Sequence, residues 1–169
     1  MSIDTFRQNF KGVRGNRFKI FGNFPGGNDA NSNDFEFYAR AASVPGSAIG
    51  IIPVGYKGRP VKFSGERTYT DWAVQVYDSS VADIRGRLEA WIDTMDSRNN
   101  HEVNYNLVKN WEVHYQDMSG TISNSNYNKK IKLINCFPVD LSPIELSYDT
   151  PDTFAEFTLT LTFDYWTYI

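Results

Sequence analysis

The sequence predicts a mainly β fold, an antiparallel β-sandwich or barrel with one α-helix packed against it. Three observations predict this fold class. Apolar and polar residues alternate over many short stretches, which is the period of half-buried strands. Aromatic residues make up 15% of the 169 residues, and their enrichment favours β-structure. One stretch breaks the alternation with a helical period, so a packed helix is expected beside the strands.

The first expected strand covers residues 17–21 (RFKIF), and a turn-rich loop over 22–34 follows it. A second strand is expected over 35–41, where Phe35, Phe37 and two alanines alternate with polar residues. The chain length fits a single domain over residues 1–169, because no linker or internal repeat divides it.

Residues 44–60 (VPGSAIGIIPVGYKGRP) combine proline and glycine with several apolar side chains. This composition predicts a loop that carries an apolar surface. The next two stretches, 61–66 and 72–77, are predicted to pair as a β-hairpin around a short connection.

A helix is expected over residues 80–98. Its apolar stripe has helical spacing and consists of Val81, Ile84, Leu88, Trp91, Ile92 and Met95. Ser80 followed by Asp83 resembles a capping box, which would start the helix near Ser80, and Gly86 weakens the helix slightly. The stripe is best explained by core packing.

Four further strands are expected over 111–116, 129–137, 144–148 and 157–166. The last of these is close to a perfect alternation (FTLTLTFDYW). Its apolar face consists of Phe157, Leu159, Leu161, Phe163 and Tyr165, and its polar face of Thr158, Thr160, Thr162 and Asp164.

Charge is distributed unevenly along a chain whose net charge is only −3. Residues 1–21 carry one acidic residue, Asp4, and five basic ones: Arg7, Lys11, Arg14, Arg17 and Lys19. From residue 133 onward there is no lysine or arginine, only carboxylates: Asp140, Glu145, Asp149, Asp152, Glu156 and Asp164. Residues 1–16 are therefore expected to form a basic N-terminal arm, which could pair with an acidic surface of another copy.

No enzymatic chemistry is predicted: we expect no catalytic residue, no cofactor and no metal. There is no phosphate-binding glycine loop or nucleophile elbow, and His101, His114 and Cys136 are too few for an ordinary zinc site. The single cysteine excludes an intrachain disulfide and is expected to be a small buried side chain. We expect no signal peptide and no membrane-spanning segment, since no apolar run is long enough.

Two stretches resemble a known family. Residues 52–78 (IPVGYKGRPVKFSGERTYTDWAVQVYD), followed by the expected helix, look like the central signature of the major tail tube proteins of contractile-tailed bacteriophages. Residues 136–166, ending in Asp164-Tyr165-Trp166, are similar to the end of the same proteins. The resemblance begins near residue 17. Two departures are the long loop FPGGNDANSND and the terminal extension TYI.

The resemblance implies a structural protein of the virion tail, assembled in the host cytoplasm. It implies six-subunit rings that stack into a hollow tube, each subunit adding strands to a continuous barrel. The implied partners are other copies of the chain, the tail sheath protein, and the baseplate and tail terminator proteins. DNA would pass through the lumen without specific binding.

The resemblance also implies roles for specific residues. The intersubunit interface is expected to include the loop residues Ile49, Ile52, Pro53, Val54, Tyr56 and Arg59, then Arg67 in the neighbouring turn and Arg7, Lys11 and Arg14 of the arm. Arg67 is equally well explained as a surface charge. Thr158, Thr160, Thr162 and Asp164 are expected to face the lumen if their strand is in the inner sheet, and sheath or solvent if it is in the outer one.

Two alternatives stay open. Related tubes occur in extracellular contractile injection systems and in type VI secretion, so the resemblance indicates the role and leaves the kind of particle open. From another class, the aromatic content would suit a monomeric carbohydrate-binding β-sandwich, whose exposed rings stack on sugars. Most of these aromatic residues, however, fall on apolar faces of expected strands.

Overall fold

The computed structural model describes residues 3–4, 13–25, 38–80, 82–96, 107–117, 129–148 and 153–169. The predicted strand start at Phe35 and Phe37 lies outside these residues. The fold class is confirmed: strands dominate, every strand pair is antiparallel, and a helix packs beside the sheet.

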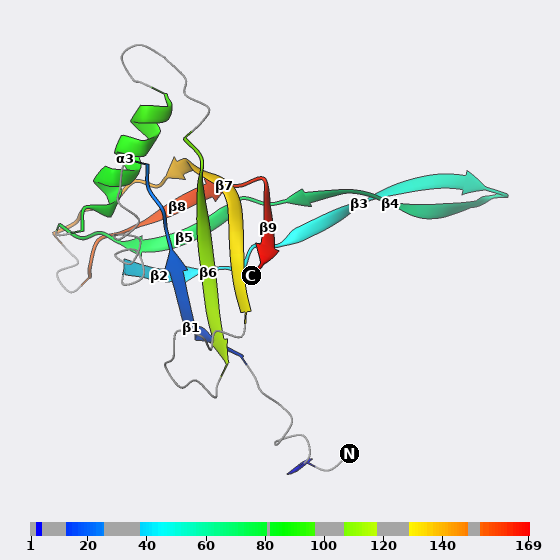
Figure 1. The fold of residues 1–169 in the computed structure, drawn as a ribbon, viewed down its shortest axis with the longest axis horizontal. Helices are drawn as coiled ribbons and strands as arrows, with labels where there is room; N and C mark the ends of the chain where they lie inside the picture. The colour runs from blue at the N-terminus through cyan, green and yellow to red at the C-terminus, as the bar shows by residue number, and fades with distance from the viewer. Residues whose placement is uncertain are drawn as a thin grey trace.

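Seven strands form one bent sheet in the order β1-β6-β7-β8-β5-β2, with β9 pairing to β7 (Figure 1). Their bounds are β1 Val13–Phe21, β2 Ala39–Ala42, β5 Trp72–Tyr77, β6 Lys109–Asp117, β7 Lys129–Leu141, β8 Glu156–Thr162 and β9 Tyr165–Tyr168. The strands predicted at 17–21, 111–116 and 129–137 are therefore confirmed. In Figure 1 the strands β1, β6 and β7 run across β5 and β8, so the sheet folds into two crossing layers.

Strand β7 joins the two layers by bending in its middle. Its first half pairs with β6 and β9, and its second half pairs with β8. At the bend Asn135 has φ 57°, a left-handed conformation that asparagine tolerates better than most residues. The backbone N–H of Asn135 donates to Asn110 Oδ1 (3.1 Å), and its side chain donates to Asp164 (2.6 Å).

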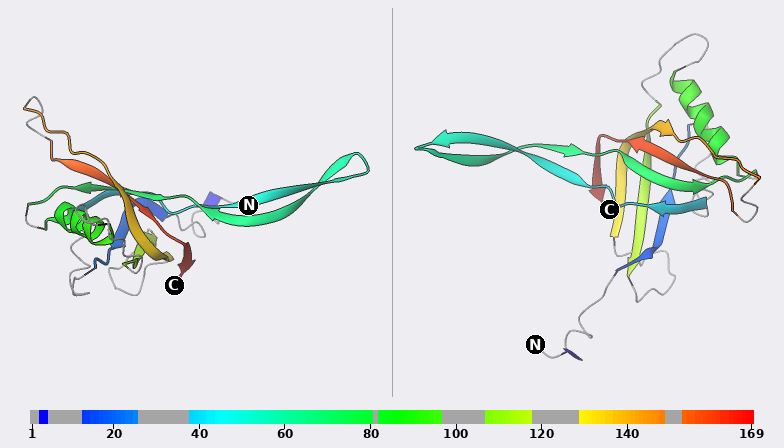
Figure 2. Two further views of the ribbon diagram at one scale, coloured as in Figure 1. Left: turned by 90° about the horizontal axis from the view of Figure 1, so that it is seen from above. Right: turned by 180° about the vertical axis from the view of Figure 1, so that it is seen from behind.

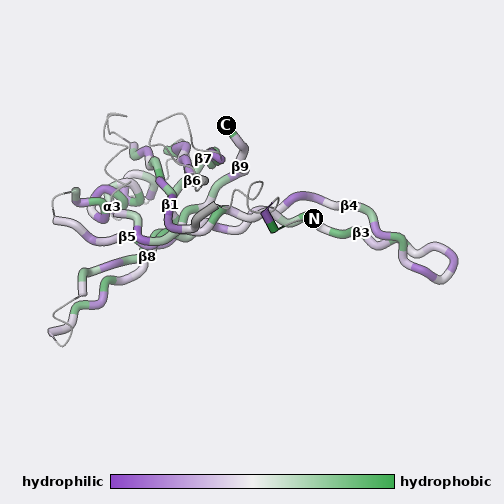
Figure 3. The backbone as a smooth tube through the Cα atoms, turned by 90° about the horizontal axis from the view of Figure 1, so that it is seen from below, coloured by the Kyte–Doolittle hydropathy of each residue, from purple (hydrophilic) through white to green (hydrophobic). Residues whose placement is uncertain are grey.

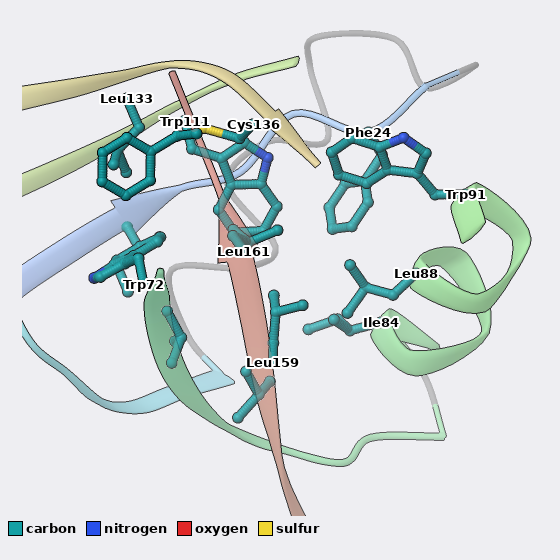
Figure 4. Packing of buried hydrophobic residues seen from close by; sticks show 14 of the residues in the cluster. Phe24, Trp72, Ile84, Leu88, Trp91, Trp111, Leu133, Cys136, Leu159 and Leu161 are labelled. Atoms are coloured by element: carbon teal, nitrogen blue, oxygen red, sulfur yellow. The ribbon is translucent and has the colours of Figure 1, made fainter. Parts of the chain in front are cut away.

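The core lies between the two layers and α3 (Ile84–Met95), as Figure 4 shows. Three tryptophans dominate it, and each indole N–H donates to a loop carbonyl: Trp72 to Ser43 (2.6 Å), Trp91 to Leu107 (2.8 Å) and Trp111 to Asn23 (3.0 Å). A buried indole needs such an acceptor because an unpaired N–H would lose its hydrogen bond to water. The three bonds thereby fasten three connecting segments to the core.

The helix is confirmed within the predicted 80–98 range, but its predicted start is wrong. Asp83 itself is the N-cap, with φ 44°, and its carboxylate accepts from the Gly86 N–H (3.2 Å). A side chain at Gly86 would collide with that carboxylate, since a Cβ there would lie 2.5 Å from it. Gly86 therefore permits the cap. The predicted stripe is buried at Ile84, Leu88 and Trp91.

Residues 44–60 do not form the predicted loop. Strand β3 (Ser47–Tyr56) pairs with β4 (Arg59–Tyr69) in a long hairpin, and the two form a separate two-stranded sheet. The predicted pairing of 61–66 with 72–77 is also wrong, because β5 pairs with β2 and β8. The physical reason is the Lys57-Gly58 turn, whose φ values of 46° and 80° suit a tight two-residue hairpin.

The strand predicted over 157–166 is divided in two, β8 and β9, by a bend at Phe163 and Asp164. Phe157, Leu159, Leu161 and Phe163 are buried as expected, whereas Tyr165 lies beyond the bend and is exposed. The strand predicted over 144–148 is wrong as well. This segment follows Pro143 without regular structure, and Leu146 and Tyr148 are exposed.

Cys136 and His114 are both buried. Burial raises the pKa of the Cys136 thiol to about 12, which fits the predicted small core side chain. His114 lies on the outer face of β6, where it bonds to Glu112 (3.1 Å) and its ring makes a tilted contact with Phe21, with centroids 4.6 Å apart. Its register partners are Lys19 and Lys130. Burial lowers the pKa of His114 below its ordinary value of 6.5, and the two lysines act in the same direction, whereas Glu112 opposes them.

This arrangement predicts acid sensitivity. Because the folded state holds His114 neutral, the unfolded chain binds the extra proton first as the pH falls below about 6.5. The free energy of unfolding should therefore fall from that pH down to the lowered pKa of the folded state, by at most about 1.4 kcal/mol per pH unit. Urea titrations of the wild type and His114→Gln between pH 5 and 8 should show a shallower decline for the variant. Equal slopes would contradict the prediction.

Candidate assembly surface

The β3–β4 hairpin projects away from the rest of the molecule (Figures 1 and 2). Within the described part of the chain its two strands pair with each other and with no other strand. All ten residues of β3 are exposed, and β4 is exposed except at Gly65 and Tyr69. An isolated two-stranded hairpin is marginally stable in water, so this element is suited to packing against another surface.

The register of the hairpin separates its side chains into two faces. One face carries five large apolar residues, which we call the apolar face: Ile52, Val54, Tyr56, Val61 and Phe63. Val54 is 47% exposed and Phe63 56% exposed. A contiguous apolar patch of this kind marks an interaction site in a soluble protein. Figure 3 shows apolar stretches along this arm and a hydrophilic tip.

Two prolines affect the outer edges of the hairpin. Tyr56 and Arg59 flank the two-residue turn and form a hydrogen-bonded pair, so pairs alternate outward from it. By this alternation Pro53 and Pro60 occupy positions whose N–H would point away from the partner strand. The two prolines therefore break no hydrogen bond between β3 and β4. They leave the outer edges with fewer backbone N–H donors, which hinders the pairing of a further strand. The face is therefore better suited to contact than the edges.

A bulge lies nearer the base of the hairpin. Ile49 is opposite Arg67 and Ile51 opposite Ser64, so β4 has one extra residue there. Gly65 approaches the Gly50 backbone so closely that a Cβ would lie 3.2 Å from it. Glycine at this point allows the two strands to come together, and bulges increase the local twist of a ribbon.

The predicted interface residues are only partly brought together. Ile52, Val54, Tyr56 and Arg59 share the apolar face, whereas Ile49, Pro53 and Arg67 lie on the opposite face. Arg67 lies within β4 and not in the predicted turn.

Sequence reasoning missed Val61 and Phe63. Their alternation after the Lys57-Gly58 turn was the signal that could have found them.

Most of the predicted basic arm, residues 1–16, falls outside the described part of the chain. Arg7 and Lys11 lie outside the described residues, and Arg14 is the second residue of β1.

The predicted lumen-facing residues are also divided. Thr158, Thr160 and Thr162 lie on the half-buried face of β8 opposite the core, whereas Asp164 lies in the bend and accepts from Asn135.

Charge differs between the two ends of the molecule. The hairpin carries Lys57, Arg59, Lys62 and Arg67 against a single carboxylate, Glu66. The segment around β8, at the opposite end, carries Glu145 and Glu156 (Figures 2 and 3). Arg40 pairs with Glu156, while Glu145 is exposed.

The described ranges contain neither a cluster of metal ligands nor a helix that could span a membrane. No group of three or more histidine, cysteine, aspartate or glutamate residues there could hold a metal ion. None of the helices in those ranges has the length and apolar character needed to cross a bilayer.

The family profile described as "Phage tail tube protein" matches residues 9–169. The chain belongs to this family. It is 24% identical over 133 residues to the tail tube protein gp19 of Enterobacteria phage T4, covering 79% of this chain and 81% of the relative. The corresponding protein of Enterobacteria phage T6 is 23% identical over the same length and coverage.

Solved structures share the fold of this tail tube family member. A chain of the anti-feeding prophage baseplate superimposes with a TM-score of 0.71 at 10% identity, covering 95% of this chain and 97% of that one. A chain from the sheath/tube terminator of the extracellular contractile injection system PVC gives 0.65 at 16% identity, covering 95% and 99%. A chain from the tube-terminating cap of the anti-feeding prophage gives 0.66 at 15% identity, covering 94% and 91%.

The exposed apolar face predicts the effect of two substitutions. Ile52→Asp together with Val54→Asp should abolish self-association while leaving the monomer folded, because both side chains lie outside the core. Burying unpaired carboxylates at a contact costs several kcal/mol. Sedimentation velocity measures association, and circular dichroism measures the fold.

The matched control is Val74→Asp, which introduces the same carboxylate at a fully buried position of β5. It should remove the folded signal itself. If the hairpin variant also loses that signal, its residues support the monomer and the interpretation is wrong.

Proposed function

We propose that this chain is the repeating subunit of a bacteriophage tail tube, built as one tail-tube domain over residues 1–169. Copies form rings of six, and the rings stack into a hollow tube that conducts DNA during ejection. The observation that carries the proposal is the apolar face of the hairpin, which the described remainder of the chain leaves exposed. Family membership supports the same role.

The partners of the proposed tube are the tail sheath protein around it and the baseplate and terminator proteins at its ends. The structural neighbours support this set, because they come from a sheath/tube terminator, a baseplate and a tube-terminating cap. The chain would then act in the virion tail after assembly in the host cytoplasm. The role is structural and involves no catalysis. The same neighbours keep one alternative open, the inner tube of a non-phage contractile injection system.

The face of the sheet around β8 is suited to a DNA-conducting lumen. Thr158, Thr160 and Thr162 lie beside Ala73 and Gln75 of β5. The strands β5 and β8 and the second half of β7 contain no lysine or arginine, and Arg40 of the adjoining β2 is paired with Glu156. Since DNA affinity comes mainly from lysine and arginine neutralising phosphates, such a lining would let a polyanion slide. Asp164 would lie at the end of this lining.

The proposed function predicts concentration-dependent self-assembly. The purified chain should pass from monomer to rings or tubes as its concentration rises, because each copy exposes an apolar face that must be buried. Size-exclusion chromatography with negative-stain electron microscopy measures the outcome. A monomer at every concentration that also binds a glycan column would favour the carbohydrate-binding alternative and contradict the proposal.

A second expectation concerns the basic arm. Arg7, Lys11 and Arg14 are proposed to lie on an acidic surface of a neighbouring copy, where each exposed pair adds about 0–1 kcal/mol. Six-fold repetition would make these small terms add up at every ring junction. Deleting residues 1–12, which precede β1, should slow tube growth and reduce its salt dependence, since screening acts over about 8 Å at physiological ionic strength.

Turbidity at 50 and 500 mM salt measures that growth, and urea titration controls for stability. If the truncated and full-length chains grow at the same rate with the same salt dependence, the arm has no part in assembly.

A further inference from the structure

A preformed groove lies at the end of the molecule opposite the hairpin. It runs between the 142–148 segment and the start of β8, has a volume of about 590 Å³, and is lined by residues that include Pro143, Glu145, Ser147, Phe154, Glu156 and Thr158. We call it the β8 groove. Figures 1, 2 and 3 all place β8 and the hairpin at opposite ends, so one copy cannot fill its own groove with its own hairpin.

The floor of the β8 groove is held by several bonds. The Ser142 N–H donates to the Thr158 carbonyl (2.9 Å), and the Thr158 N–H donates to Ser142 Oγ (2.8 Å). Arg85 of α3 donates to the Ser142 carbonyl (2.9 Å). Phe154 stands against Tyr77, with ring centroids 6.4 Å apart. These bonds hold Ser142 against β8 without an occupant, which lowers the entropy cost of ordering that side of the groove on binding.

The chemistry of the groove complements that of the hairpin. Phe154 is 84% exposed and offers an apolar surface, and Glu145 offers an exposed carboxylate. The apolar face of the hairpin has its own charge, Arg59, which is opposite Tyr56 next to the tip. Glu156 is already paired with Arg40, so Glu145 is the carboxylate left for Arg59.

The hairpin has the reach and the shape for this contact. A strand of ten residues at about 3.3 Å per residue extends about 33 Å, far enough to cross into a neighbouring subunit. Pro53 and Pro60 disfavour strand addition at its edges, which favours contact through a face, and the apolar face carries the larger set of exposed apolar side chains.

We propose that the apolar face of one copy's hairpin docks in the β8 groove of a second copy, with Arg59 paired to Glu145. The inference rests on the proposed function and specifies its contact. Because hairpin and groove are different surfaces, the contact is heterologous and repeats from copy to copy, as a ring or a filament requires. Thr158 lines the groove, so docking would cover it, and of the three threonines proposed above for the lumen only Thr160 and Thr162 would stay open.

A charge exchange tests the pairing. Arg59→Glu and Glu145→Arg should each raise the critical concentration for assembly about tenfold, because each puts like charges together at the contact. The double variant restores opposite charges and should assemble close to the wild-type concentration. Asp71→Arg, which makes the same charge change at an exposed site outside the groove, is the matched control and should have no effect. Light scattering and electron microscopy give the readouts.

Cross-linking tests the same contact without relying on charge. A mixture of Arg59→Cys protein and Glu145→Cys protein, treated with a short bifunctional thiol reagent, should yield a cross-link between copies at these two positions. The native Cys136 is buried and should stay unmodified.

The outcomes separate this inference from the proposed function. If Glu145→Arg assembles as the wild type does, and the double variant behaves like Arg59→Glu alone, the hairpin docks elsewhere and the inference is overturned, while tube assembly stands. If Ile52→Asp with Val54→Asp assembles normally, the hairpin is no interface at all and both are overturned. Absence of the cross-link in assembled tubes would likewise overturn the docking.

Discussion

The packing of the three buried tryptophans is the interaction on which the rest of this structure depends. Trp72 and Trp111 meet edge to face between the two layers, with ring centroids 6.3 Å apart, and Phe24 bridges Trp111 to Trp91 of α3. Each indole also needs a hydrogen-bond acceptor, and each finds it in a connecting segment. The same three side chains thus bury the apolar surface and position the loops around the sheet.

A core concentrated in this way leaves the hairpin without support from its own subunit. The bend of β7 at Asn135 closes the two layers around the tryptophans, and the chain between β2 and β5 extends outward as β3 and β4. An arm that carries Ile52, Val54 and Phe63 into solvent is a liability for a monomer. In a repeating subunit of the kind proposed above, the same arm would contact a neighbouring copy, and the prolines on its edges would restrict that contact to its faces.

The family profile and the fold comparison agree for this chain. The family profile spans nearly the whole chain, and the structural neighbours share the fold at identities of 10 to 16%. At such identities few side chains are shared, so the likeness lies in the fold. A structural subunit tolerates this divergence because its function lies in the shape of its surfaces.

The sequence by itself determined the elements whose signal is local. The alternation in 157–162 and 111–116, and the helical stripe of Ile84, Leu88 and Trp91, depend only on period, so they could be predicted. Much of the hairpin's apolar surface could be recognised too, because Ile52, Val54 and Tyr56 are unusual in a stretch that looks like a loop. Only the tertiary structure decided which strands distant in the sequence pair, since β5 pairs with β2 and β8 and not with the neighbouring β4. It also decided where β8 ends, because Asp164 bonds to Asn135, a residue 29 positions away. Pairing and bending depend on such distant contacts, which no local period contains.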